Sequence, residues 1–144
     1  MSATVDASVL LYASDESSRY HEPAEAFLRD LAGGPGITYL FWPTVMAYVR
    51  IATHPTVFTS PLTPEEALTN IDNLLAIPHV RTIGEQDRFW QLYLDASTAA
   101  GARGNLVPDA HVVALMLENG VRTIWTHDRD YRRFDEIEVR DPFE

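Results

Sequence analysis

Short apolar runs alternate with helical patterns along this chain, and this alternation restricts its fold more than any other feature. Brief runs rich in Val, Ile and Thr are typical of strands, whereas the segments between them repeat apolar residues at helical spacing. The expected strands are Ala3–Asp6, Ile37–Leu40, Val80–Ile83, Arg122–Thr126 and Glu138–Arg140. The first expected helix begins at Val9. The others cover Glu22–Leu31, Pro43–Thr53, Thr63–Ala76, Glu85–Ala100 and Asp109–Asn119. This order predicts a three-layer α/β/α fold with a central parallel sheet of four to five strands.

Size and composition exclude several classes of protein. The 144 residues predict one domain, residues 1–144. The chain has no cysteine, which excludes disulfides, thiolate metal sites and cysteine nucleophiles. It has no lysine, so no lysine base, Schiff base or P-loop lysine is available. No apolar run approaches the ~20 residues that cross a bilayer, and the N-terminus lacks a signal-peptide pattern. We therefore expect a cytoplasmic protein without membrane contact.

Three carboxylates occupy the same structural context in this predicted sheet. Asp6 ends the first strand, Asp109 opens the late helix, and Asp128 lies just after the fourth strand. Ligands of open α/β sheets bind beyond the carboxyl ends of the strands, at the point where strand order reverses. Each aspartate also has an ordinary local explanation, since Asp109 can complement a helix dipole and Asp128 can shape a turn. Their joint placement favours a shared site.

A divalent cation resolves the repulsion that three clustered carboxylates create. Mg²⁺ or Mn²⁺ prefers oxygen ligands and, once bound, polarises a phosphoryl group and activates water. The formal net charge of −10 argues against a generic nucleic-acid-coating protein, because phosphate contacts dominate such binding. It does not exclude a metal-dependent nuclease, since a filled carboxylate site attracts phosphate.

Four segments stand out in a fixed order: Val5–Tyr12, Trp42–Pro55, Pro108–His111 and Thr126–Phe134. Taken together, they resemble the PIN-domain family and in particular its VapC-type toxins. No single segment is specific, but the ordered set covers nearly the whole chain. The resemblance implies a Mg²⁺-dependent endoribonuclease, with Mn²⁺ able to substitute, that acts on RNA. It also implies a VapB-like antitoxin as partner and a homodimer.

The same resemblance assigns roles to individual residues. Asp6 and Asp109 correspond to the principal metal ligands, and Asp128 corresponds to the third acid, so these three are the expected catalytic and metal-binding residues. Thr126 is expected to orient the site as a polar neighbour. Ser8 either hydrogen-bonds the site or caps the helix that follows the first strand.

One departure from the family pattern affects the expected site. Many members carry a glutamate in the mid-chain helix at the position of Tyr48, and this chain has no acid between Asp30 and Glu65. Asp130 is either a partial substitute or a cap on the surface. The missing acid motivates an alternative function, a catalytically inactive PIN-like binding domain.

The remaining candidates are basic or histidine side chains beside these acids. Arg129, with Arg132 and Arg133, either contacts RNA phosphates or forms a solvated basic surface. His111 and His127 would allow a histidine-containing Zn²⁺ or Mn²⁺ site, although their spacing matches no common metal motif. A receiver domain of the response-regulator type and a haloacid-dehalogenase-type phosphatase are disfavoured, because both need a lysine and the phosphatase also needs an Asp-x-Asp motif.

Overall fold

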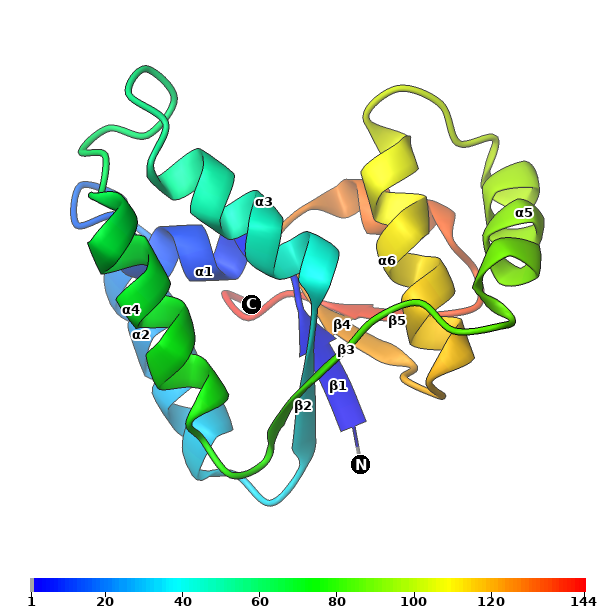
Figure 1. Ribbon diagram of the computed structural model, residues 1–144, viewed down its shortest axis with the longest axis horizontal. Helices are drawn as coiled ribbons and strands as arrows, with labels where there is room; N and C mark the ends of the chain where they lie inside the picture. Colours follow the sequence, from blue (N-terminus) through cyan, green and yellow to red (C-terminus); the bar gives the residue numbers. More distant parts are fainter. Residues whose placement is uncertain (1) are drawn as a thin grey trace.

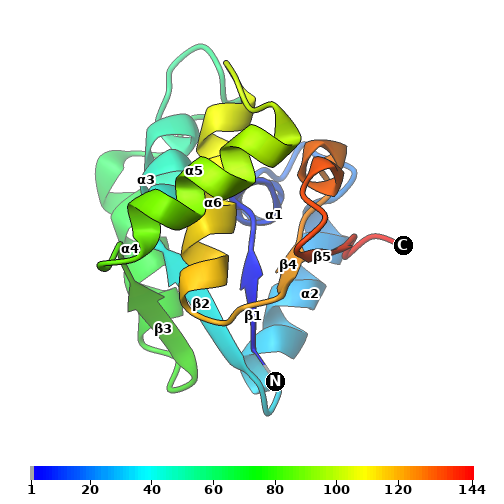
Figure 2. The same ribbon diagram turned by 90° about the vertical axis from the view of Figure 1, so that its right-hand side faces the viewer.

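The molecule is built around a parallel sheet whose strands follow the order β3-β2-β1-β4-β5 (Figure 2). The computed structural model describes residues 2–144. The strands are β1 (Ser2–Val5), β2 (Ile37–Phe41), β3 (Val80–Ile83), β4 (Thr123–Trp125) and β5 (Glu138–Arg140). The predicted parallel sheet is confirmed, with the fifth strand present. Strand order reverses beside β1, because the chain first extends the sheet through β2 and β3 and then returns to add β4 and β5.

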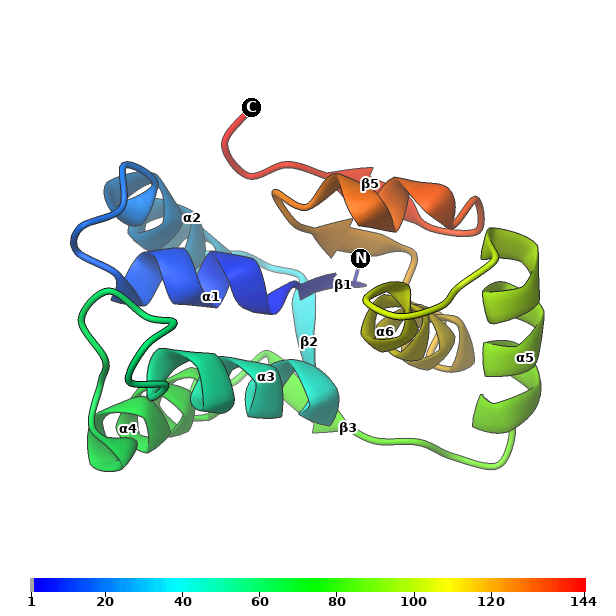
Figure 3. The same cartoon turned by 90° about the horizontal axis from the view of Figure 1, so that it is seen from above.

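Helices cover both faces of this sheet and complete the three predicted layers. Four helices, α1 (Ala7–Ser14), α2 (His21–Gly33), α3 (Trp42–Ala52) and α4 (Pro64–Leu75), lie on one side. The other side carries α5 (Phe89–Ala100) and α6 (Leu106–Glu118), as the view from above makes plain (Figures 1 and 3). A short 3-10 helix, η1 (Arg129–Arg133), links β4 to β5 and was not expected from the sequence. None of the helices in residues 2–144 is long and apolar enough to span a membrane.

Helix α6 is the centre of the larger apolar core. It is apolar on nearly every side, with six consecutive or near-consecutive buried residues from Ala110 to Met116. A helix of this composition must be covered all round. The sheet contributes Phe41 and Ile124 to one side of it, and α5 packs Phe89 and Ala96 against the other. Full burial of each large side chain contributes about 1.5–3 kcal/mol, so this packing fixes where the first turn of α6 lies.

Two predicted helix starts differ from those observed by three residues or more. Helix α6 begins at Leu106, three residues before Asp109. Pro108 is tolerated in its first turn, because the N–H groups of a first turn have no partner within the helix and the missing N–H of proline costs no hydrogen bond there. Helix α5 begins at Phe89 rather than Glu85, since the N–H groups of Gln86 and Arg88 donate to the Glu118 carboxylate, each at 2.9 Å. These bonds hold the preceding segment in a non-helical turn.

The helix start predicted at Thr63 is confirmed in detail. The Thr63 hydroxyl accepts the N–H of Glu66 at 3.1 Å, and the Glu66 carboxylate accepts the N–H of Thr63 at 3.0 Å. This reciprocal capping box satisfies two otherwise unpaired donors. Helix α4 is thereby anchored over β3, where it closes one side of the α1–α4 layer.

Candidate active site and metal centre

The carboxyl ends of β1 and β4 meet at the point where strand order reverses. The two strands are paired neighbours, with Val5 opposite Trp125. The Asp6 N–H continues the pairing and donates to the Trp125 carbonyl oxygen at 2.9 Å. The residues that follow the two strands therefore emerge side by side, which is the general position of ligand sites in open parallel sheets.

Asp6 is held in this position by two hydroxyl groups. Its Oδ2 accepts hydrogen bonds from the Ser8 hydroxyl at 2.7 Å and from the Thr126 hydroxyl at 2.8 Å. Ser8 thus hydrogen-bonds the acid, and no side-chain cap on α1 is formed by Asp6. Burial raises the pKa of the Asp6 carboxyl, the two hydroxyl bonds lower it in part, and the charge of Asp128 raises it further. Both bonds favour the ionised carboxylate in a buried setting.

Thr126 connects the first acid to the last. While its hydroxyl donates to Asp6, the same oxygen accepts the N–H of Asp128 at 2.9 Å. Asp128 in turn caps η1, because its Oδ1 accepts the N–H of Asp130 at 2.9 Å. The Thr126 side chain is only 1% exposed, so this chain of bonds is shielded from competing water. The turn after β4 consequently presents two carboxylates to the same region.

Three carboxylates come close enough to share one ion. Oxygen atoms of Asp109, Asp128 and Asp130 all lie within 4.8 Å of one another. Asp109 reaches the other two from the first turn of α6. Asp6 is not a member of this tightest set, although its charge raises the pKa of Asp109. Asp130, which the sequence allowed to be either a partial substitute for the missing acid or a surface cap, belongs to this set of three.

The electrostatics of Asp109 report the crowding of negative charge. Burial, and then in order of size the charges of Asp128, Asp6 and Asp130, raise the pKa of its carboxyl to about 7. A hydrogen bond with the Tyr131 hydroxyl acts in the opposite direction. Tyr131 is itself buried, and burial with the nearby acids raises its pKa well above the usual range.

The donor set suits a hard divalent cation. All candidate ligands are carboxylate oxygens, which Mg²⁺ and Mn²⁺ prefer, and two of the three clustered acids are exposed and leave room for water ligands. A bound dication would also offset the repulsion that raises the pKa of Asp109. Histidine takes no part in the clusters found among residues 2–144. His111 pairs with Glu85 at 3.1 Å and His127 with Asp141 at 2.7 Å, so the histidine-containing site is not formed.

A pocket of about 270 Å³ opens beside the acids. Asp6, Ser8, Asp109 and Tyr131 line one side of it, and one face of α3 lines the other. That face presents Pro43, Thr44, Ala47, Arg50 and Ile51. No acidic side chain comes from α3, as the sequence predicted.

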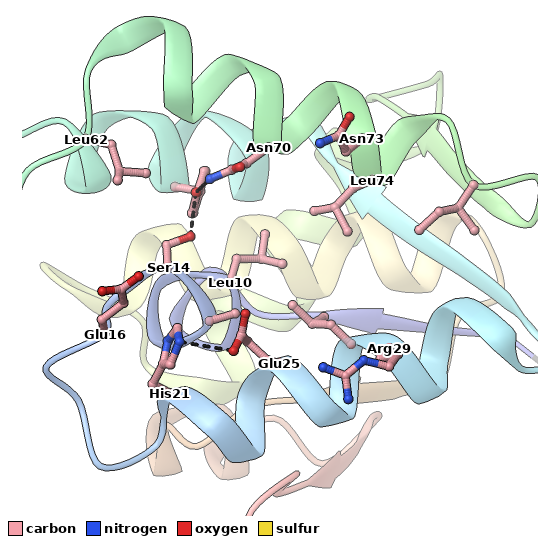
Figure 4. A pocket seen from close by; sticks show the side chains of 14 residues that line it. Leu10, Ser14, Glu16, His21, Glu25, Arg29, Leu62, Asn70, Asn73 and Leu74 are labelled. Atoms are coloured by element: carbon pink, nitrogen blue, oxygen red, sulfur yellow. Dashed lines mark hydrogen bonds and ion pairs between the residues drawn. The ribbon is translucent and has the colours of Figure 1, made fainter.

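Tyr48, at the position where many family members carry a glutamate, does not line this pocket. Its ring is buried on the opposite face of α3, and its hydroxyl contacts Ser14 Oγ at 2.7 Å and accepts from Asn70 Nδ2 at 2.9 Å. These partners lie at a second cleft of about 440 Å³ between α1, α2 and α4 (Figure 4). An acid at position 48 would therefore face this cleft rather than the aspartates.

Taken together, fold and site define a class: a doubly wound parallel α/β domain with an acidic pocket at its switch point. The model of the family described as "PIN domain" matches residues 3–137. The chain is 47% identical over 143 residues to ribonuclease VapC48 of Mycobacterium tuberculosis, covering 99% of each chain. It is 33% identical to ribonuclease VapC37 of the same organism, covering 96% of this chain and 95% of that one.

Solved structures show the same fold. VapBC2 from Rickettsia felis, bound to a promoter DNA fragment, matches with a TM-score of 0.73 at 12% identity, over 98% of each chain. VapC20 from M. tuberculosis, described as a sarcin–ricin loop cleaving toxin, matches with a TM-score of 0.69 at 17% identity, over 96% of this chain and 98% of that one. The chain belongs to the PIN-domain family, and the resemblance to VapC-type toxins stated from the sequence is confirmed.

Proposed function

We propose that this chain is a divalent-metal-dependent endoribonuclease, the toxin of a VapBC-type toxin–antitoxin module, acting in the cytoplasm. One observation carries the proposal: carboxylate oxygens of Asp109, Asp128 and Asp130 lie within 4.8 Å of one another, at the strand ends where Asp6 also lies. The full-length identity to VapC ribonucleases supports the same activity.

Asp6, Asp109 and Asp128 are the proposed metal-binding and catalytic residues, with Asp130 as a further ligand. Bound Mg²⁺ or Mn²⁺ would polarise the scissile phosphodiester and lower the pKa of a bound water, so no protein nucleophile is needed. Thr126 and Ser8 hold the Asp6 carboxylate in one orientation through their hydrogen bonds. Arg129, exposed on η1 next to Asp128, is the proposed contact for an RNA phosphate outside the pocket.

The proposed partners are a VapB-like antitoxin and a second copy of the chain. Structural neighbours include VapBC complexes, which supports the antitoxin. The cleft lined by Leu10, Leu28, Leu62 and Leu74 offers an apolar floor with a polar rim of Glu25 and other side chains, which suits the apolar face of a helix (Figure 4). This cleft lies away from the acids, so antitoxin docking and the metal site are separable by mutation.

RNA end-mapping after induced expression tests the proposed function. We expect new 5′ ends with the unmodified protein and none with Asp6→Ala. The matched control is Asp72→Ala, because Asp72 is an exposed acid on α4 whose side chain makes no hydrogen bond or ion pair among residues 2–144. Purified protein should cleave the same RNA with Mg²⁺ or Mn²⁺ and lose this activity in chelator.

A second measurement separates the enzyme from an inactive binding domain, the alternative that the missing acid on α3 motivates. Mn²⁺ titration followed by thermal unfolding should stabilise the protein, because an ion that binds only the native state raises its stability. Absence of stabilisation, together with identical RNA ends for the unmodified protein and Asp6→Ala, would establish the binding-domain alternative instead.

A further inference from the structure

Among residues 2–144, Arg50 is the only basic side chain that lines the acidic pocket. It stands on the α3 face that also carries Ala47 and Ile51, one helical turn from each other, opposite Asp6 and Asp109. In the sequence, Arg50 belongs to the Trp42–Pro55 segment and has no predicted role of its own. Its place is set by the buried face of α3, since Val45, Tyr48 and Ala52 are in the core and turn Arg50 outward.

This arginine shares a pocket with two carboxylates and yet pairs with neither. Within residues 2–144 its guanidinium makes no ion pair within 4.0 Å and no hydrogen bond. The side chains of Arg19, Arg81 and Arg140 have partners within residues 2–144, whereas Arg50 is distinguished by its place in the pocket beside Asp6 and Asp109. A free guanidinium across a gap from carboxylates leaves space for an anion between them.

We propose that Arg50 binds a phosphate of the RNA substrate inside the acidic pocket, opposite the aspartates. The inference rests on the proposed function and adds a substrate-binding residue to it. The guanidinium presents a planar fork of donors that matches two phosphate oxygens, which a point charge cannot do. The pocket has a volume of about 270 Å³, many times what a single water needs, and so has room for a phosphate group.

The location of Arg50 also explains how a chain with a net charge of −10 can hold a polyanion. Binding does not need a basic surface overall, provided that positive groups stand where the backbone enters. Arg50 inside the pocket and Arg129 outside it would contact different phosphates of the same strand. The role requires contact with RNA and not support of the fold, because the Arg50 side chain is exposed.

The test measures RNA affinity against salt in a cleavage-silent background, Asp109→Asn, using a single-stranded oligoribonucleotide with Mg²⁺ and fluorescence anisotropy. Each phosphate contact on a single strand contributes about 0.7 to the slope of log affinity against log salt. Arg50→Gln should reduce the slope by about 0.7 and weaken binding roughly tenfold near 50 mM salt, since charge-assisted bonds are among the stronger ones. Arg50→Lys should keep the slope, but in the otherwise unmodified enzyme it should slow single-turnover cleavage because the fork is lost.

Arg122→Gln is the matched control, because Arg122 is exposed at the amino end of β4, the opposite edge of the sheet. It removes the same charge and should leave slope and affinity unchanged. Equal slopes for Arg50→Gln and Arg122→Gln would overturn the proposal. Failure of the proposed function has a different signature, absence of cleavage by the unmodified protein with Mg²⁺ or Mn²⁺; a slope change specific to Arg50 would still support the phosphate contact.

Discussion

Replacing Asp109 with asparagine should stabilise the metal-free protein while abolishing RNA cleavage. The pKa of this carboxyl rises from 3.8 to about 7 in the folded state, chiefly through burial and then through the charges of Asp128 and Asp6. A shift of this size corresponds to roughly 4 kcal/mol of unfavourable charge. Because the side chain is partly exposed, solvent screening reduces the expected effect to about 2 kcal/mol.

The sign of this effect depends on pH. Above its unfolded pKa, Asp109 binds more protons in the folded state than in the unfolded state, so its contribution lowers stability as pH rises from about 4 to 7. Well below pH 3.8 the carboxyl is protonated in both states and costs nothing. The advantage of Asp109→Asn should therefore be small near pH 4, grow through this window and stay constant above about pH 7.

Thermal unfolding in chelator at several pH values is the assay. A gain of about 2 kcal/mol should raise the Tm of a chain of this length by roughly 5–8 °C at pH 8. Asp72→Asn, which removes the same charge from the exposed surface of α4, should shift Tm little. Added Mn²⁺ should stabilise the unmodified protein and not Asp109→Asn. A lower Tm for Asp109→Asn at pH 8, or full cleavage activity, would refute the reasoning.

Two further substitutions probe the hydrogen bonds around the site. Thr126→Val removes one donor to Asp6 and the acceptor of the Asp128 N–H in a buried setting. Urea unfolding should show a loss of about 1–3 kcal/mol in the free energy of unfolding, and RNA cleavage should fall with it. Unchanged cleavage would mean that the orientation of these acids is unimportant. Tyr48→Phe removes a hydroxyl that bonds Ser14 and Asn70 at the other cleft, so it should lower the free energy of unfolding by about 1 kcal/mol. The cleavage rate per folded molecule should stay the same. A selective loss of cleavage would show that this side of α3 serves the acidic site.

The sheet and the meeting of Asp6 with the turn after β4 were predictable because both follow from periodicity and from the rule for parallel strands. The short strands of Val, Ile and Thr stand out from helices of different period, and all five appear where expected. Helix starts were less predictable. The loop before α5 is held by Glu118, a residue distant in sequence, and no local pattern encodes that contact.

The site differs from its prediction where side-chain direction decides. Asp130 joins the acid cluster because the Asp128 side chain caps η1. The sequence of this 3-10 helix shows no hydrophobic periodicity from which it could have been predicted. Tyr48 could have been placed from helix phase alone. It falls three residues after Val45 and four before Ala52, all of them buried, which puts it on the core face and leaves Ala47 and Arg50 toward the pocket.

The cost at Asp109 bears on the choice between an enzyme and an inactive binding domain. A domain that needed only its fold would be more stable with an uncharged side chain at this position, since the core of α6 is complete without the carboxylate. Carboxylates placed to repel one another lower stability unless something binds between them, and strain of this kind is typical of sites that trade stability for function. A divalent cation would remove the repulsion and turn Asp109 into a stabilising ligand. Metal binding and folding stability are therefore expected to be linked through this one residue.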